Sequence, residues 1–225
     1  MKVFAGKYED AIQLIRSRKF RVWEGGTLDV ADHWVNAHLL RGQQSFAAGR
    51  FSAALADFEA AKTIPDNLPN DSDRGSGRSA EIAWWIGCAQ EKIGNPEAAK
   101  RSWQVAAESA KPSRRRGGEG GLSERHVQLY FQALAKRKLG EGDDAVFRTL
   151  VETGSRAIQS TNSEPSVERP RDRRPANAHM ALAHYVTGLG HLGLGEKDKA
   201  MSEFTTALQS APDFLAAKTE LTRMQ

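Results

Sequence analysis

Six histidines and one cysteine are the side chains best suited to acid–base or metal chemistry, and their spacing forms no familiar site. No two histidines are four residues apart, so the helical His pair of many zinc sites is missing. Cys88 has no obvious partner base, and we expect it to be a structural thiol. The histidines, which we expect to pack rather than bind metal, are His33, His38, His126, His179, His184 and His191.

Phosphate and acid–base chemistry have no clear support either. The glycine-rich run at 117–121 lacks the preceding strand and the GK[ST] ending of a phosphate-binding loop. Carboxylates are plentiful but scattered, and no two stand out as an acid and a base. The sequence therefore predicts a non-enzymatic protein, with no catalytic residue, metal or cofactor.

Arginines gather in two stretches that could contact phosphate. Neither stretch is interleaved with aromatic residues, and Glu168 and Asp172 dilute the second. We expect solvated connectors, and nucleic-acid binding is an alternative that the composition disfavours. The arginines concerned are Arg114, Arg115, Arg116, Arg169, Arg171, Arg173 and Arg174.

The overall composition is that of a globular helical protein. The chain has 225 residues, 40% of them apolar and 27% charged, with a net charge of +4. The single cysteine excludes an internal disulfide and favours a reducing compartment. The N-terminus lacks a signal-peptide core, and the longest apolar run, at 82–87, is too short for a bilayer. We expect a cytoplasmic protein with no membrane partner.

A repeating spacing organises the helices that would position these side chains. A glycine followed five residues later by an alanine recurs at intervals of 43, 45, 46 and 55 residues. Each glycine separates two helix-like patterns, and Asn95-Pro96 is typical of a helix start. Asp29 likewise predicts a helix that runs to Ala48. The pairs are Gly6/Ala11, Gly49/Ala54, Gly94/Ala99, Gly140/Ala145 and Gly195/Ala200.

Residues 181–213 resemble the tetratricopeptide repeat, in which helix A and helix B form an antiparallel pair. The matching residues, in order, are Gly188, Gly195, Ala200, Phe204, Ala207 and Pro212. Two further units match in part, through Gly42, Gly49, Ala54, Phe58 and Ala61, and through Gly87, Gly94, Ala99, Trp103 and Ala106. A weaker unit has Ala133, Gly140 and Ala145, with Thr149 and Glu152 where an aromatic and an alanine are expected.

The resemblance implies an all-α fold, an α-solenoid of about four and a half antiparallel helix pairs in a single domain. The expected divisions are a half unit at 1–20 and units at about 28–64, 79–110, 123–154 and 176–212. The spacing exceeds the usual period of about 34 residues, and the excess falls in loops that are either a binding face or plain connectors. Because the first unit is incomplete, we expect the chain to be a fragment of a longer protein.

In this family helix A residues line a concave groove, which implies a protein or peptide partner. Trp84, Tyr130 and Tyr185 share one position and could form an aromatic ladder, or could pack internally. His38 and His184 fall where the repeat usually buries an aromatic side chain. The Lys and Asn positions of the family's chaperone-binding members are not matched. The groove candidates are Leu39, Gln43, Trp84, Cys88, Glu91, Tyr130, Leu134, Arg137 and Tyr185.

The segment RKFRVWEGGT at 18–27 is predicted to be a connector between the half unit and the first full pair. Phe20 and Trp23 are expected to pack as an apolar plug, with Gly25 and Gly26 turning the chain, while Glu24 has no packing role. The segment also resembles the C-terminal region of large bacterial proteins with a β-rich N-terminal part, some linked to carbohydrate processing. An accessory region bound to a neighbouring domain, or a homo-oligomer, is therefore the alternative to a groove that binds a separate partner.

Overall fold

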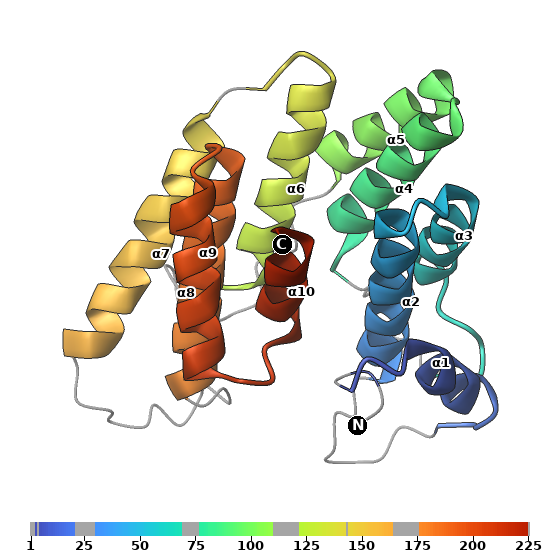
Figure 1. The fold of residues 1–225 in the computed structure, drawn as a ribbon, viewed down its shortest axis with the longest axis horizontal. Coiled ribbons are helices and arrows are strands. Elements are labelled where there is room, and N and C mark those ends of the chain that lie inside the picture. The colour runs from blue at the N-terminus through green and yellow to red at the C-terminus, as the bar shows by residue number, and fades with distance from the viewer. Residues whose placement is uncertain are drawn as a thin grey trace. The chain divides into compact units, whose positions relative to one another are not determined.

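The computed structural model describes residues 3, 5–20, 30–68, 77–109, 122–142, 144–163 and 176–224. Its regular elements are all α-helices, as expected from the sequence, and within these ranges there is no strand. The helices, labelled in Figure 1, are α1 (Tyr8–Arg16), α2 (Val30–Ala47), α3 (Phe51–Ala61), α4 (Ser79–Ile93), α5 (Pro96–Glu108), α6 (Glu124–Lys138), α7 (Ala145–Ser163), α8 (Ala176–Gly193), α9 (Lys197–Ser210) and α10 (Leu215–Met224).

The chain divides into two compact units, Met1–Ser109 and Ala110–Gln225. In the first unit, helices that follow one another in sequence also pack together, from α1 through α5. In the second unit α8 packs closely on both α7 and α9, while α6 makes smaller contacts with α7 and α8. Each unit is therefore assembled mainly from helices that are neighbours along the chain.

The glycines expected between paired helices adopt the left-handed backbone conformation that ends a helix. Gly49, Gly94 and Gly195 have φ angles of 74°, 89° and 80°, and Gly140 has 80°. After Gly94, the side chain of Asn95 accepts a hydrogen bond from the backbone of Ala98 at 3.2 Å, with Pro96 as the first helical residue. The sequence prediction of these turns, and of the N-cap at Asn95, is confirmed.

Three helix pairs share a close contact between a glycine on the first helix and an aromatic ring on the second. A Cβ added to Gly42 would lie 2.5 Å from Phe58, one on Gly87 2.4 Å from Trp103, and one on Gly188 2.5 Å from Phe204. The aromatic residue follows the glycine by 16 residues in all three. The small residues thus allow the helix backbones to approach, as the spacing predicts.

The third pair does not follow this pattern. Ala145, Thr149 and Glu152, aligned with the buried positions of the other second helices, are exposed on α7. The buried side chains of α7 are instead Phe147 and Leu150, so the prediction that Thr149 stands at the aromatic position is wrong. The buried face of α7 is thus shifted relative to the repeat pattern, because Phe147 and Leu150 remove more apolar surface from water than Thr149 would.

Close backbone approach recurs in the second unit between α7 and α8. Added Cβ atoms on Gly154 and Gly190 would meet backbone atoms of the facing helix at 2.9 Å and 2.8 Å. Gly193 faces the Phe147 ring, where an added Cβ would lie 2.1 Å away. Small residues thus let α7 lie along α8, and the sequence-adjacent partner α6 contacts α7 less extensively.

In the first unit, Trp85 on α4 joins two helix pairs. Its ring stacks on Phe58 of α3 at 5.6 Å and meets the edge of Phe46 of α2 at 5.7 Å. The Trp85 side chain is almost fully buried, at 4% exposure. This aromatic cluster holds α4 against the α2–α3 pair.

Candidate functional site

The predicted groove residues of the first unit differ in accessibility. Leu39 and Gln43 on α2 are buried, Trp84 and Cys88 on α4 are half-buried, and Glu91 is exposed. The Trp84 ring lies 6.2 Å from that of Trp103 on α5. On α4, part of the Trp84 and Cys88 surfaces and the side chain of Glu91 are therefore accessible to solvent.

In the second unit the two tyrosines of the predicted ladder pack inside the protein. Tyr130 and Tyr185 are 5% and 4% exposed. Tyr130 contacts the rings of Phe131 and Phe147, at centroid distances of 5.2 and 5.9 Å. Tyr185 contacts Phe204 at 5.7 Å. Leu134, on the same helix as Tyr130, is half-buried.

The C-terminal segment that begins at Phe214 lies close to these two tyrosines. Phe214, just before α10, meets the Tyr185 ring at 5.4 Å. Burial, and then the nearby Glu220 carboxylate of α10, raise the pKa of Tyr130. The C-terminal segment therefore contacts the groove candidate Tyr185 of α8 and places a carboxylate near Tyr130 of α6.

Arg137, also predicted to face the groove, connects three parts of the second unit. Its guanidinium donates hydrogen bonds to the backbone carbonyl of Gly193 at 2.8 Å and to Asp144 at 2.6 Å. It also lies over the Phe147 ring, 4.5 Å from the centroid. These contacts satisfy a carbonyl at the C-terminal end of α8, where a cation is electrostatically favoured.

The connector is described only at its beginning. Trp23, Gly25, Gly26 and Glu24 lie outside the described residues. Phe20 is half-buried, and its backbone N–H donates to the carbonyl of Asn67 at 3.2 Å. The Asn67 side chain in turn donates to the carbonyls of Ile15 and Arg18, at 2.8 and 2.7 Å. Asn67 thus ties the end of α1 to the loop after α3, a contact that the sequence reading missed.

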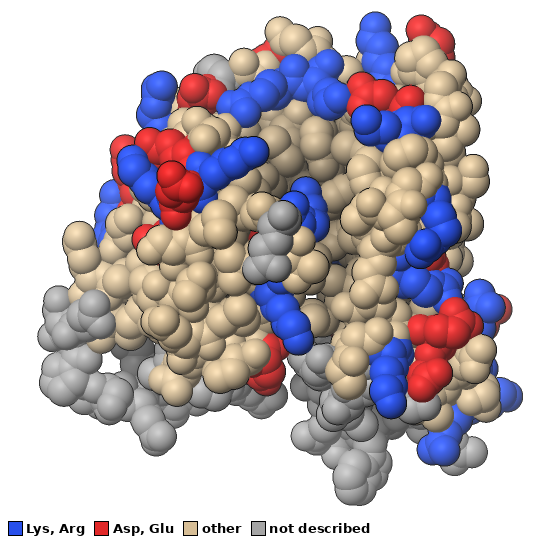
Figure 2. Space-filling view, viewed as in Figure 1, with Lys and Arg blue, Asp and Glu red and all other residues tan. Residues whose placement is uncertain are grey.

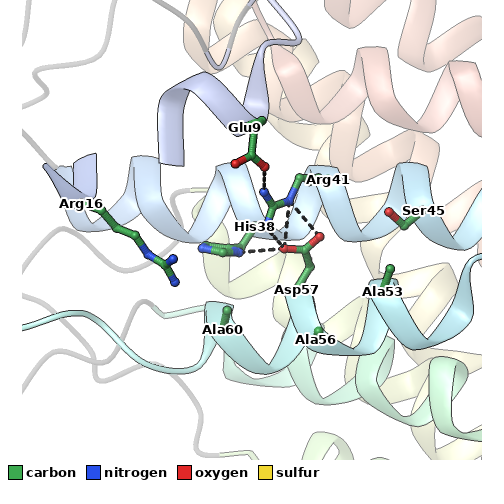
Figure 3. A pocket seen from close by; sticks show the side chains of 9 residues that line it. All are labelled: Glu9, Arg16, His38, Arg41, Ser45, Ala53, Ala56, Asp57 and Ala60. Atoms are coloured by element: carbon green, nitrogen blue, oxygen red, sulfur yellow. Dashed lines mark hydrogen bonds and ion pairs between the residues drawn. The ribbon is translucent and has the colours of Figure 1, made fainter. Parts of the chain in front are cut away.

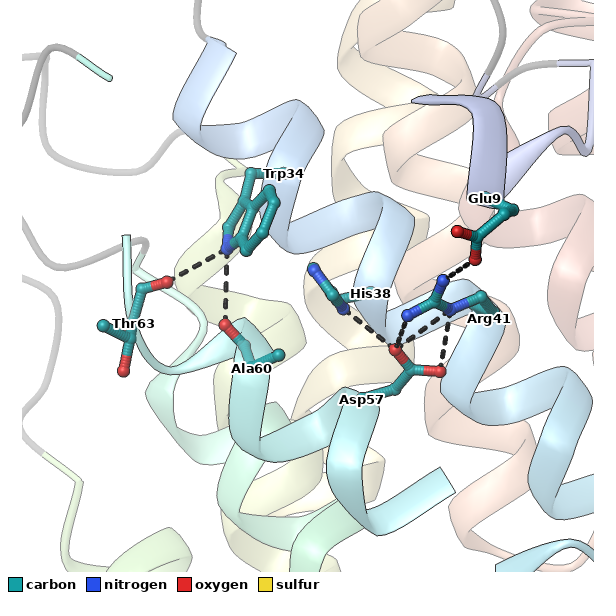
Figure 4. A network of polar contacts seen from close by, with 7 residues as sticks. All are labelled: Glu9, Trp34, His38, Arg41, Asp57, Ala60 and Thr63. Atoms are coloured by element: carbon teal, nitrogen blue, oxygen red, sulfur yellow. Dashed lines mark hydrogen bonds and ion pairs between the residues drawn. The ribbon is translucent and has the colours of Figure 1, made fainter. Parts of the chain in front are cut away.

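A buried polar network lies on the side of α2 away from the predicted groove positions. Since each residue turns a helix by about 100°, His38 and Arg41 face roughly opposite to Leu39 and Gln43. Arg41 Nε lies 3.0 Å from both carboxylate oxygens of Asp57 on α3, and Arg41 Nη2 lies 2.6 Å from Oδ1. Arg41 also donates to Glu9 of α1. The network links the first three helices (Figure 4).

His38 completes this network. Its Nδ1 lies 2.9 Å from Asp57 Oδ1, and because an ionised carboxylate only accepts, Nδ1 carries the proton. Burial by itself raises the pKa of Asp57, but the hydrogen bonds from His38 and Arg41 outweigh it and leave the pKa below its ordinary value. The hydrogen bond to Asp57 is also the main reason that the pKa of Arg41 is raised.

Trp34 covers one side of the network. Its indole N–H donates to the carbonyls of Thr63 and Ala60, at 3.0 and 3.3 Å, which fixes the ring over the end of α3. The ring meets that of His38 edge to face, 4.2 Å between centroids, and Arg16 lies 5.4 Å from its centroid. Trp34 therefore stands between the network and the last turn of α1.

A second histidine–carboxylate pair has the same spacing. His184 Nδ1 on α8 lies 2.8 Å from Glu203 on α9, and 19 residues separate these two as they separate His38 and Asp57. The sequence reading placed both histidines at equivalent positions but missed their carboxylate partners. The signal was present, since in both pairs the acid directly precedes the buried aromatic residue, Phe58 or Phe204.

The remaining features weighed in the sequence are the arginine stretches, metal binding and membrane spanning. The arginine stretches at 114–116 and 169–174 lie outside the described residues. On the face in Figure 2, basic side chains adjoin acidic ones in several places. Within the described ranges, no three His, Cys, Asp or Glu side chains come together as metal ligands. No described helix combines the length and apolar character required to cross a bilayer.

Comparison with known proteins found no matching family model, no matching curated protein and no matching solved structure.

Proposed function

We propose that this chain is a non-enzymatic interaction module of the tetratricopeptide type, an α-solenoid that binds a protein segment through its first helices. The observation that carries the proposal is the glycine–aromatic contact repeated at one spacing in three helix pairs. Each pair also ends its first helix at a left-handed glycine. Recurrence of one supersecondary unit is the defining feature of solenoid proteins, whose main use is binding of extended partners.

The surface proposed for the partner is centred on α4. Trp84 offers part of an indole ring, Cys88 a small apolar group and Glu91 an exposed carboxylate on one helix face. Aromatic side chains with a polar rim are common anchors of protein interfaces. In the second unit, the half-buried Leu134 offers a smaller anchor of the same kind.

The test is affinity capture with the whole chain as bait, followed by direct binding measurements with each protein recovered. The binding variant combines Trp84→Ala with Glu91→Lys. The control variant combines Val105→Ala and Met201→Ala, two exposed apolar residues on second helices, 59% and 36% accessible. We expect the binding variant to lose at least tenfold in affinity, with a circular dichroism spectrum like that of the wild type.

Partners that bind both variants as tightly as the wild type would show that the first-helix face is not the binding surface. A catalytic turnover by the isolated chain would contradict the non-enzymatic assignment.

A further inference from the structure

The network of the first unit borders a cleft of about 460 Å³ between α1, α2 and α3. Arg16 comes from α1, His38 and Ser45 from α2, and the exposed Ala53 and Ala56 from α3 (Figure 3). This cleft opens on the side of α2 opposite to the predicted groove. Its described lining residues come from α1, α2 and α3, so a ligand bound in it would be independent of the partner surface proposed on α4.

Two polar groups at one end of the cleft lack partners of their own. His38 is 2% exposed, and its Nε2 has no hydrogen-bond partner in the described part of the chain. Arg16 is exposed, forms no hydrogen bond or ion pair with a described residue, and lies over the Trp34 ring, 5.4 Å from its centroid. In Figure 3, Arg16 and the His38 ring lie toward the same end of the cleft, away from Ser45 and Ala53.

Arg41, in contrast, is fully engaged. Its guanidinium is held by the carboxylates of Asp57 and Glu9. A buried nitrogen such as His38 Nε2 is costly to leave unpaired, by about 1–3 kcal/mol. This nitrogen lies toward the same end of the cleft as the exposed guanidinium of Arg16, so a ligand that accepts hydrogen bonds from both would satisfy it.

We propose that this cleft binds a carboxylate, held by the guanidinium of Arg16 and by the Nε2–H of the doubly protonated His38. The planar fork of an arginine matches the two oxygens of a carboxylate. Asp57 already accepts the proton of Nδ1, so Nε2 can donate only when His38 is positively charged. Binding therefore takes up a proton at His38.

The charges that face His38 favour a ligand with a single negative charge. Arg16 and Arg41 balance Asp57 and Glu9, so the cluster is neutral when His38 is neutral and carries +1 when it is protonated. One carboxylate restores neutrality, whereas a phosphate dianion would leave a net negative charge beside two acids. The alanines of α3 that line the cleft offer apolar surface to a short aliphatic chain.

The second histidine–carboxylate pair supplies an internal control. His184 contacts Glu203 as His38 contacts Asp57, but Met180 and Thr187 stand where α2 has Trp34 and Arg41. Thr187 is buried and donates to the carbonyl of Ala183. At these two aligned positions the His184–Glu203 pair therefore lacks the aromatic residue and the arginine that accompany His38.

The experiment is an NMR titration of the histidine ring nitrogens in the whole ¹⁵N-labelled chain, repeated at several pH values. Propionate is the probe, N-acetylglutamate amide stands for a peptide side chain, and inorganic phosphate is the comparison anion. We expect saturable shifts of the His38 signals with either carboxylate, and no comparable shifts of His184. The carboxylate that binds more tightly assigns the source as a free acid or a protein side chain.

Two variants test the partners. Arg16→Gln should weaken propionate binding at least tenfold, and Arg101→Gln, at an exposed position on α5, should leave it unchanged. Melting curves of both variants check that α1 remains folded. Affinity should fall as the pH rises, by at most about tenfold per pH unit, because binding takes up one proton.

The proposal is overturned if the His38 signals do not move, or if they move equally in Arg16→Gln. It is also overturned if phosphate binds as tightly as propionate, or if affinity does not change with pH. All of these outcomes are independent of whether a protein partner binds the opposite face.

Discussion

Gly42 and Phe58 are in such close contact that a methyl group on Gly42 would lie 2.5 Å from the Phe58 ring. The ring is fully buried and cannot move aside without displacing its neighbours, among them Trp85. A glycine inside a helix normally weakens it relative to alanine by about 1 kcal/mol. Here the glycine is retained because the helix pair needs the space that a side chain would occupy.

Gly42→Ala is therefore expected to destabilise the protein by roughly 1–3 kcal/mol, although alanine is the better helix former. Gly87→Ala and Gly188→Ala should behave alike, because they face Trp103 and Phe204 in the same way. Urea unfolding monitored by circular dichroism gives the values. Phe58→Leu combined with Gly42→Ala should recover part of the loss, since the smaller side chain leaves room. Stabilisation by Gly42→Ala alone would contradict the close contact.

The second prediction concerns the buried face of α7, which is shifted relative to the repeat pattern. Phe147→Ala should cost about 3–5 kcal/mol, because the buried ring contacts Tyr130, Arg137 and the Gly193 region. Thr149→Ala, two residues further along, should change stability by no more than about 0.5 kcal/mol because Thr149 is exposed. Thermal unfolding of the two variants is the measurement. If Thr149→Ala were instead the more destabilising substitution, the third helix pair would follow the regular repeat spacing.

Asp57→Asn should weaken the first unit by roughly 2–4 kcal/mol, since the amide loses the charge that holds both His38 and Arg41. The pKa of Asp57 lies below its ordinary 3.8, so its contribution is complete above that pH and is lost as pH falls through the lowered value.

The difference in the free energy of unfolding between wild type and Asp57→Asn should therefore be larger at about pH 5 than at about pH 2. Denaturant unfolding at the two pH values measures it. Glu59→Gln is the control, because Glu59 lies on the same helix but in an exposed ion pair with Lys62. If this difference in the free energy of unfolding did not change with pH, the ionised form of Asp57 would not be the source of the stability.

Asn67→Ala should release the end of α1, because the side chain bonds two carbonyls there, Ile15 and Arg18. Each such bond contributes about 1 kcal/mol. Hydrogen exchange of the α1 amides should become roughly tenfold faster or more for a loss of that size. Asp66→Ala, at the exposed neighbouring position, should leave exchange unchanged. Unchanged exchange in Asn67→Ala would show that α1 is held by other contacts.

Much of the fold could be predicted from the sequence because its signals are local. Glycines at positive φ, the cap at Asn95 and the course of α2 depend on residues within a few positions of each other. The spacing of Gly188 and Phe204 also reports directly on one helix pair. In the third pair local spacing was misleading, because burial of Phe147 against α6 and α8 outweighed the repeat pattern.

By itself, the sequence determined that the chain is helical, where its paired helices turn, and which residues make three of the pairs close-packed. These features follow from backbone preferences and short-range side-chain contacts. Only the tertiary structure decided that Tyr130 and Tyr185 are buried and that Arg137 bonds the end of α8. It alone brought Glu9, Arg41 and Asp57 together, because these residues lie on three helices whose packing brings them within bonding distance.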